Sequence, residues 1–97
     1  MNYEVIVPES VYLELRKEAK YYESKAENLG VSFILMWTES MAQIKKAPLM
    51  FQKKHKQLRS IKMQRFPYLL IFEVQDNKVT VYRLIQAKKS YRKIFKK

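Results

Sequence analysis

The residues of this sequence with the clearest chemical capacity are lysines and arginines that recur through its second half. Their side chains donate hydrogen bonds to phosphate oxygens and neutralise the charge of a polyanion. Each alone is expected to be a solvated surface charge, but together they predict a binding surface. The cations expected to contact a target are Arg59, Lys62, Arg65, Arg83, Lys88, Lys89 and Arg92.

The charge is segregated along the 97 residues. Residues 1–44 hold four Lys or Arg and seven Glu, whereas residues 45–97 hold sixteen Lys or Arg and only two acids, Glu73 and Asp76. The formal net charge of +11 is therefore concentrated in the second part of the chain. Segregation of this kind predicts a nucleic acid or an acidic protein as the partner.

Groups for independent catalysis or for metal and cofactor binding are scarce. The chain has no cysteine, one glycine and one histidine, His55, which lies in the basic run KKHK. A phosphate-binding loop needs several glycines, and a zinc site needs clustered histidines or cysteines. We therefore predict no metal site, no small-molecule cofactor and no independent hydrolase site.

The elements that must position the cations begin with a strand and two helices. YEVIV at 3–7 is rich in β-branched residues and predicts a strand, and Pro8 suits the start of a helix. Apolar residues then recur at helical spacing, at Val11, Leu15, Ala19, Tyr22, Ala26 and Leu29. Gly30 is expected to cap this helix at its C-terminus, and a second helix is expected from about Ser32 to Lys46. The two should form an antiparallel hairpin.

After a connector at 48–55 the pattern changes to that of strands. The expected strands are 58–64, 68–74 and 78–85, the last two joined by a tight turn at Asp76-Asn77. YLLIFEV at 68–74 is apolar at nearly every position, which is typical of a central strand covered on both faces. The predicted fold is α+β in the order β-α-α-β-β-β, with a helical hairpin packed on a mainly antiparallel sheet. We expect one domain over residues 1–97, ending in a basic C-terminal tail.

The sequence indicates no membrane segment. Its longest mostly apolar stretch, VSFILMW at 31–37, is far shorter than the roughly 20 residues that a membrane-spanning helix needs. The first ten residues, MNYEVIVPES, lack the cationic and apolar regions of a secretory signal. We therefore expect a soluble, cytoplasmic protein with no membrane partner.

A set of residues in a characteristic order runs from about residue 11 to residue 91. It comprises Tyr21, Tyr22, Leu29, Gly30 and Phe33, then Ile44, Pro48 and Phe51, then Arg59, and last Phe66, Pro67 and Tyr68. An apolar strand, a D/N turn, a second apolar strand and a polar–basic segment at 86–91 follow. In this order and spacing the chain resembles toxins of the RelE/ParE superfamily, the toxic half of type II toxin–antitoxin pairs, and is closest to the ParE-like "plasmid stabilization" branch.

The resemblance implies one of two targets, the first being the ribosome. RelE-like members cleave mRNA there, using several cations and a C-terminal tyrosine for acid–base and electrostatic catalysis. Lys62 and Lys89 match two of the basic positions, but Leu69 stands at the arginine position and Phe95 at the tyrosine position. The residues that could substitute for the missing groups are Tyr91 and His55, and the spacing favours neither of them. The weak catalytic candidates are therefore Lys62, Lys89 and Tyr91.

The second implied target is DNA gyrase, which ParE-like members poison through a binding surface without a catalytic set. The missing nuclease residues favour this branch, although Gln86 replaces its histidine, Lys89 its arginine, and its proline is absent. The expected function is a ParE-like toxin that arrests bacterial growth. The alternatives are a RelE-like ribosome-dependent mRNA interferase and, from another class, a non-toxic basic nucleic-acid-binding module.

The resemblance also implies a cognate antitoxin as partner. Ile34, Leu35 and Met36 make the second helix apolar around more of its circumference than a two-layer core requires. We expect the antitoxin to cover these residues, with simple burial in the core as the alternative. Arg83 interrupts an apolar strand and is expected either to face solvent or to anchor an acidic residue of the partner.

Overall fold

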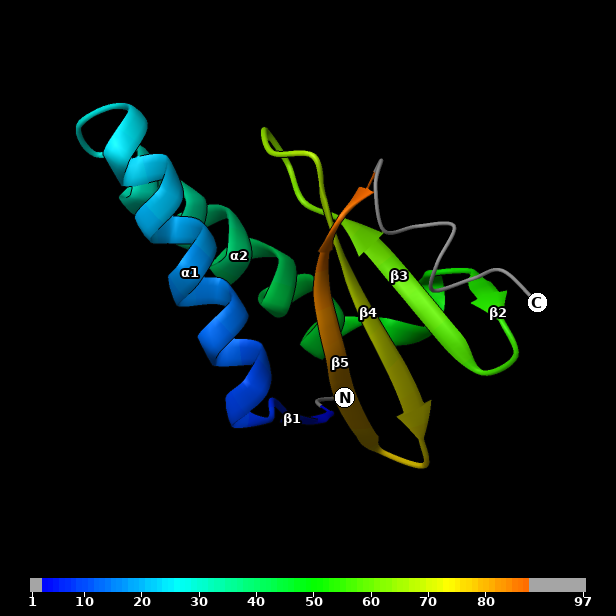
Figure 1. Ribbon diagram of the computed structural model, residues 1–97. Helices are drawn as coiled ribbons and strands as arrows, with labels where there is room; N and C mark the ends of the chain where they lie inside the picture. The colour runs from blue at the N-terminus through cyan, green and yellow to red at the C-terminus, as the bar shows by residue number, and fades with distance from the viewer. Residues whose placement is uncertain (1–2, 88–97) are drawn as a thin grey trace.

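The computed structural model describes residues 3–87, which form one layer of helices against one sheet (Figure 1). The predicted hairpin of helices and the meander of strands are both present, so the predicted α+β fold is confirmed. The elements in chain order are β1 (Glu4–Ile6), α1 (Glu9–Lys25), α2 (Leu29–Lys46), the 3-10 turn η1 (Pro48–Met50), β2 (Lys53–His55), β3 (Leu58–Lys62), β4 (Tyr68–Gln75) and β5 (Lys78–Gln86).

The sheet has the strand order β1-β5-β4-β3-β2, with β4 at its centre. β1 runs parallel to β5, and all other neighbours are antiparallel. The turn between β4 and β5 uses Asp76 at a φ of 56°, as the D/N pair predicted. The predicted connector at 48–55 proved to hold η1 and β2, a short edge strand that the sequence pattern did not reveal.

The main core lies between the helices and one face of the sheet. Alternate residues of β4 point to that face and pack with β5 and with the inner faces of both helices. This cluster includes Val11, Phe33, Trp37, Ile44, Tyr68, Leu70, Phe72, Val79, Val81 and Leu84. The intervening residues Leu69 and Ile71 join Ile85 in a second buried cluster, against which Leu58 packs. The five apolar residues 68–72 of β4 are therefore buried, on both faces of the sheet, as predicted for this strand.

Gly30 does not cap the first helix, contrary to the prediction. α1 ends at Lys25, and Gly30 is the second residue of α2. The left-handed turn falls instead on Asn28, at a φ of 68°, because asparagine tolerates this conformation. A Cβ on Gly30 would lie 2.5 Å from the carbonyl oxygen of Ala19, so the glycine serves the close crossing of the two helices.

The N-terminus of α2 is capped by a carboxylate from α1. Glu23 accepts hydrogen bonds from the backbone N–H groups of Asn28 at 2.9 Å and Gly30 at 2.8 Å. These hydrogen bonds favour the charged form and so lower the pKa of the Glu23 carboxyl below its usual value of 4.5. The bond from Asn28 has the largest effect. Glu23 thus satisfies two backbone N–H groups at the start of the second helix.

Candidate target-binding and partner-binding surfaces

The cation Arg83 lies on β5, at a free edge of the sheet. β1 pairs with β5 only as far as Thr80, so the rest of β5 has no strand beside it on that side within residues 3–87. A bulge follows, because Ile71 stands opposite Arg83 while Phe72 stands opposite Val81, which leaves Tyr82 as the extra residue. The edge and the bulge place the Arg83 side chain where it can reach α1.

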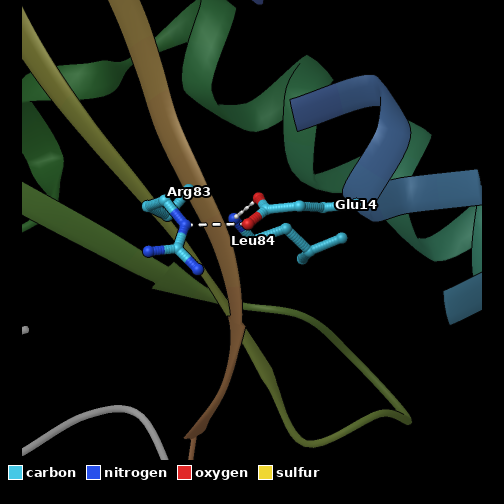
Figure 2. A network of polar contacts seen from close by, with 3 residues as sticks. All are labelled: Glu14, Arg83 and Leu84. Atoms are coloured by element: carbon cyan, nitrogen blue, oxygen red, sulfur yellow. Dashed lines mark hydrogen bonds and ion pairs between the residues drawn. The ribbon is translucent and has the colours of Figure 1, made fainter. Parts of the chain in front are cut away.

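Glu14 of α1 occupies this edge in place of a strand (Figure 2). Its carboxylate accepts a hydrogen bond from Nε of Arg83 at 2.8 Å and another from the backbone N–H of Leu84 at 3.0 Å. Arg83 does anchor an acidic residue, but that residue belongs to its own chain. Half of the Arg83 side chain remains exposed, so the rest of its guanidinium is still accessible to a target.

A second carboxylate of the same helix, that of Glu18, binds the hydroxyl of the core residue Tyr68. The Tyr68 hydroxyl donates to Oε1 of Glu18 at 2.6 Å, and the Gln86 amide lies 3.4 Å from the same hydroxyl. Burial, together with the hydrogen bond to Glu18, raises the pKa of Tyr68 well above its usual value, so this phenol stays protonated and acts as a donor. The sequence pattern did not single out Glu14 or Glu18, because each is one glutamate among several on the polar face of α1.

Arg59 lies on the helix-facing side of β3 and holds a neighbouring segment in place. Its Nη1 donates to the carbonyl oxygen of Phe51 at 2.6 Å, and the residue is partly buried. Phe51 in turn packs edge-on against Phe72, with ring centroids 6.0 Å apart. At least one guanidinium nitrogen of Arg59 is therefore used within the fold. Arg59 is less accessible than Lys62, Arg65 and Arg83, which are exposed.

Lys62 and Arg65 lie at one end of the sheet, where β3 leads into β4. Lys62 is exposed on the face opposite the helices and stands across from Leu69, whose other partner is Ile85 near the end of β5. Arg65 is exposed in the connecting loop at a φ of 73°, with its guanidinium 5.7 Å from the centroid of the Phe66 ring. The fold brings these two predicted cations together. Lys88, Lys89, Tyr91 and Arg92 are outside the described residues.

The residues predicted to meet an antitoxin divide into two groups. Met36 is partly buried against the main core, as the alternative predicted, whereas Ile34 and Leu35 are 42% and 56% exposed. Ile34 lines an apolar groove on the outer side of the hairpin, together with Arg16, Lys17, Ala19, Lys20, Tyr21, Glu23, Gly30 and Val31. Arg83 does not line this groove. Lys17 lies between the two regions, because it lines this groove and also the smaller cavity around Arg83.

Other kinds of site are not seen in the part of the chain that the structure describes. Neither helix in residues 3–87 combines the length and apolarity needed to cross a membrane. Over the same residues, no group of three or more His, Asp or Glu side chains is arranged to hold a metal ion.

Comparison with known proteins adds one finding. No protein-family model and no curated protein sequence matches this chain. Its backbone, in contrast, matches a chain of the solved structure described as the chromosomal ParDE TA system from P. aeruginosa, with a TM-score of 0.78 and 10% sequence identity. The match covers 89% of this chain and 97% of the other.

The chain has the RelE/ParE-like toxin fold. This confirms the fold that the resemblance in the sequence implied, a helical hairpin packed on a mainly antiparallel sheet. At 10% identity the likeness concerns the path of the backbone, and a shared fold does not by itself carry a shared activity.

Proposed function

We propose that this protein is the toxin of a type II toxin–antitoxin pair and arrests bacterial growth in the cytoplasm by a ParE-like action on DNA gyrase. The observation that carries the proposal is the match of almost the whole backbone to a chain of a ParDE TA system. The basic character of residues 45–97 supports a target that presents phosphates, such as gyrase with its DNA. A cognate antitoxin is the expected second partner.

The surroundings of Leu69 support binding to the target over cleavage of RNA. This residue stands where the resemblance gives nuclease members an arginine. Its side chain is buried with Ile71 and Ile85, so the position belongs to an apolar cluster. A buried aliphatic side chain can neither bind a phosphate nor transfer a proton, so Leu69 cannot take the role of that arginine.

Lys62 and Arg65 are the described cations best placed to contact the target, because both are exposed and lie at the same end of the sheet. We expect the double variant K62E/R65E to fold and to lose growth arrest when expressed. The control is K78E, which reverses one exposed charge at the opposite end of β5. Arrest that persists in a folded K62E/R65E protein would exclude this end of the sheet as the target contact.

Two assays with purified protein distinguish the targets. In a reaction of gyrase with plasmid DNA, we expect the protein to inhibit supercoiling and to increase the amount of cleaved plasmid. In a reconstituted translation reaction, we expect intact mRNA when its ends are mapped by primer extension. Codon-phased cuts would instead establish an mRNA interferase, and a lack of growth arrest would favour the non-toxic nucleic-acid-binding module.

The antitoxin is proposed to cover the apolar groove of the hairpin and the neighbouring face of α2. Val31 and Ile34 line this groove and, like Leu35, are about half exposed, an arrangement that fits the apolar side of a partner helix. Arg16 and Lys20 on its α1 wall suit acidic residues of the same partner. Genomic fragments that restore growth during expression of the toxin would identify the antitoxin.

A further inference from the structure

The turn between the helices and the sheet exposes two large apolar side chains. Leu49 and Met50 of η1 are 56% and 79% exposed, and Met50 is the most exposed large apolar residue in the described chain. Neither Leu49 nor Met50 is among the residues that carry the resemblance or the proposed function. Two adjacent exposed apolar side chains form only a small apolar patch, so a role in binding depends on what surrounds them.

The turn is held in place by its neighbours on both sides. Pro48 is buried, and the N–H of Met50 donates to the carbonyl oxygen of Ala47 at 3.2 Å. Phe51 packs against Phe72, and its carbonyl oxygen accepts the short hydrogen bond from Arg59. Leu49 and Met50 are therefore exposed to solvent on a turn that its neighbours hold in place.

Lysines flank the apolar pair on both sides. Lys45 and Lys46 end α2 just before the turn, and Lys53, Lys54 and Lys56 follow it in β2 and in the tight turn into β3. All five are exposed, and no acidic residue occurs between Glu39 and Glu73. Within residues 3–87, the one ion pair joins Glu14 to Arg83, so these lysines have no carboxylate partner among the described residues.

The position of these groups in the fold leaves them open to a large partner. Figure 1 shows β2 at the edge of the sheet farthest from β1, with the segment of η1 leading to it from the end of α2. The sheet edge, the turn and the end of the helix therefore carry a continuous stretch of residues 45–56, which we term the lysine–methionine turn. Its formal charge is +5, and its centre is apolar.

We propose that the lysine–methionine turn is a binding site for duplex DNA, recognised through its backbone and without regard to sequence. The lysines would contact phosphates, which a duplex carries at about one negative charge per 1.7 Å of its length. Leu49 and Met50 would lie against the sugars and base edges of the minor groove, as apolar wedges between cations do in other DNA-binding proteins. This goes beyond the proposed function, since it requires neither an antitoxin nor growth arrest.

Duplex DNA fits this site better than a membrane does. Two apolar side chains bury too little surface for a stable anchor in a lipid bilayer, which requires a longer apolar face or an attached acyl chain. Five exposed lysines that precede and follow a small apolar centre along the chain suit a duplex, in which rows of phosphates border the grooves. An acidic protein could also bind the lysines, but it would not offer the regular row of phosphates that a duplex carries.

The test is the binding of the purified full chain to a labelled duplex of about 20 base pairs, followed by fluorescence polarisation at several salt concentrations. We expect K53Q/K54Q/K56Q to weaken binding at least about tenfold and to reduce the salt slope by about three, because each lysine neutralises about one phosphate. The matched control K17Q/K20Q/K25Q removes three exposed lysines from α1 and the same net charge. We expect it to change the affinity less than about twofold.

The apolar pair is tested separately by L49S/M50S, which leaves every charge in place. We expect weaker binding to the duplex with an unchanged salt slope, because phosphate neutralisation determines that slope. Thermal unfolding of each variant shows whether it is folded. Equal losses from the two lysine triplets, or no effect of L49S/M50S, would overturn the proposal.

Competing partners provide further outcomes. Tighter binding to single-stranded RNA of the same length, or to vesicles with anionic lipid, would overturn the assignment to duplex DNA. So would an absence of measurable binding to the duplex at low salt. Growth arrest is scored independently: a K53Q/K54Q/K56Q protein that loses DNA binding but still arrests growth would support the DNA site and leave the toxin proposal intact. A protein that binds DNA as expected without arresting growth would refute only the toxin proposal.

Discussion

At Gly30, a single missing side chain allows α1 and α2 to touch through their backbones. A Cβ there would meet the carbonyl oxygen of Ala19 at 2.5 Å and Oε1 of Glu23 at 3.0 Å. G30A gains helix propensity of about 1 kcal/mol. Because a backbone oxygen cannot turn aside, the helices must nevertheless separate, and we expect a net loss of about 1–3 kcal/mol in the free energy of unfolding.

Urea unfolding followed by circular dichroism measures this loss. V31A, at the adjacent exposed position, is the control and should change the free energy of unfolding by less than about 0.5 kcal/mol. If G30A were as stable as the parent, the hairpin would tolerate a wider crossing and the close approach would have no energetic role.

Among the elements, α1 and β5 depend on one glutamate for their polar connection. Glu14 satisfies the backbone N–H of Leu84 and the guanidinium of Arg83 at an edge where β1 has already ended. E14A leaves both donors without this acceptor. We expect it to lower the free energy of unfolding by about 1–2 kcal/mol, toward the lower end because both side chains are partly exposed.

The variant E14Q separates the two parts of this interaction, because its amide oxygen can still accept from Leu84 while the charge is gone. It should recover part of the loss seen in E14A, as measured by the same unfolding experiment. E39A removes an exposed glutamate of α2 and serves as the control. Identical stabilities for E14A and E39A would mean that the edge is solvated equally well by water.

Local pattern was sufficient to predict much of the architecture at this scale. The run YLLIFEV predicted a central strand, and the apolar spacing of α1 and α2 predicted their inner faces, because burial imposes a period on the sequence. The predicted end of α1 was wrong, because either Asn28 or Gly30 can follow a helix. Only the close approach of Gly30 to Ala19 shows that Asn28 forms the left-handed turn and that Gly30 serves the helix crossing. β2 was missed because three residues, two of them exposed lysines, carry no periodic signal.

The candidate site was harder to predict for a related reason. Strand order alone brings Lys62 near the end of β5, but the partner of Arg83 is 69 residues away and is one of several equivalent glutamates on α1. For Arg59, alternation places the side chain on the same face as Ile61 without saying whether the guanidinium reaches solvent. It reaches the carbonyl oxygen of Phe51, a backbone acceptor that has no signature in the sequence.

In the whole molecule, the charge segregation of the sequence becomes a separation in space. The helical layer contains most of the acids, whereas residues 45–87, which include η1 and four of the five strands, hold ten Lys or Arg against two acids (Figure 1). Like charges on one side of a small protein repel one another and destabilise the folded state. Salt screens this repulsion beyond a distance of about 10 Å at 0.1 M. The melting temperature should therefore rise with salt concentration.

The two lysine triplets test this expectation directly. K53Q/K54Q/K56Q removes charge from the repulsive side, so its melting temperature in low salt should exceed that of the parent and should rise less as salt is added. K17Q/K20Q/K25Q removes lysines that share α1 with Glu14, Glu18 and Glu23, so it should not gain stability. A parallel salt response in all three proteins would contradict the argument. If the first variant is the more stable one, its loss of DNA affinity cannot be attributed to unfolding.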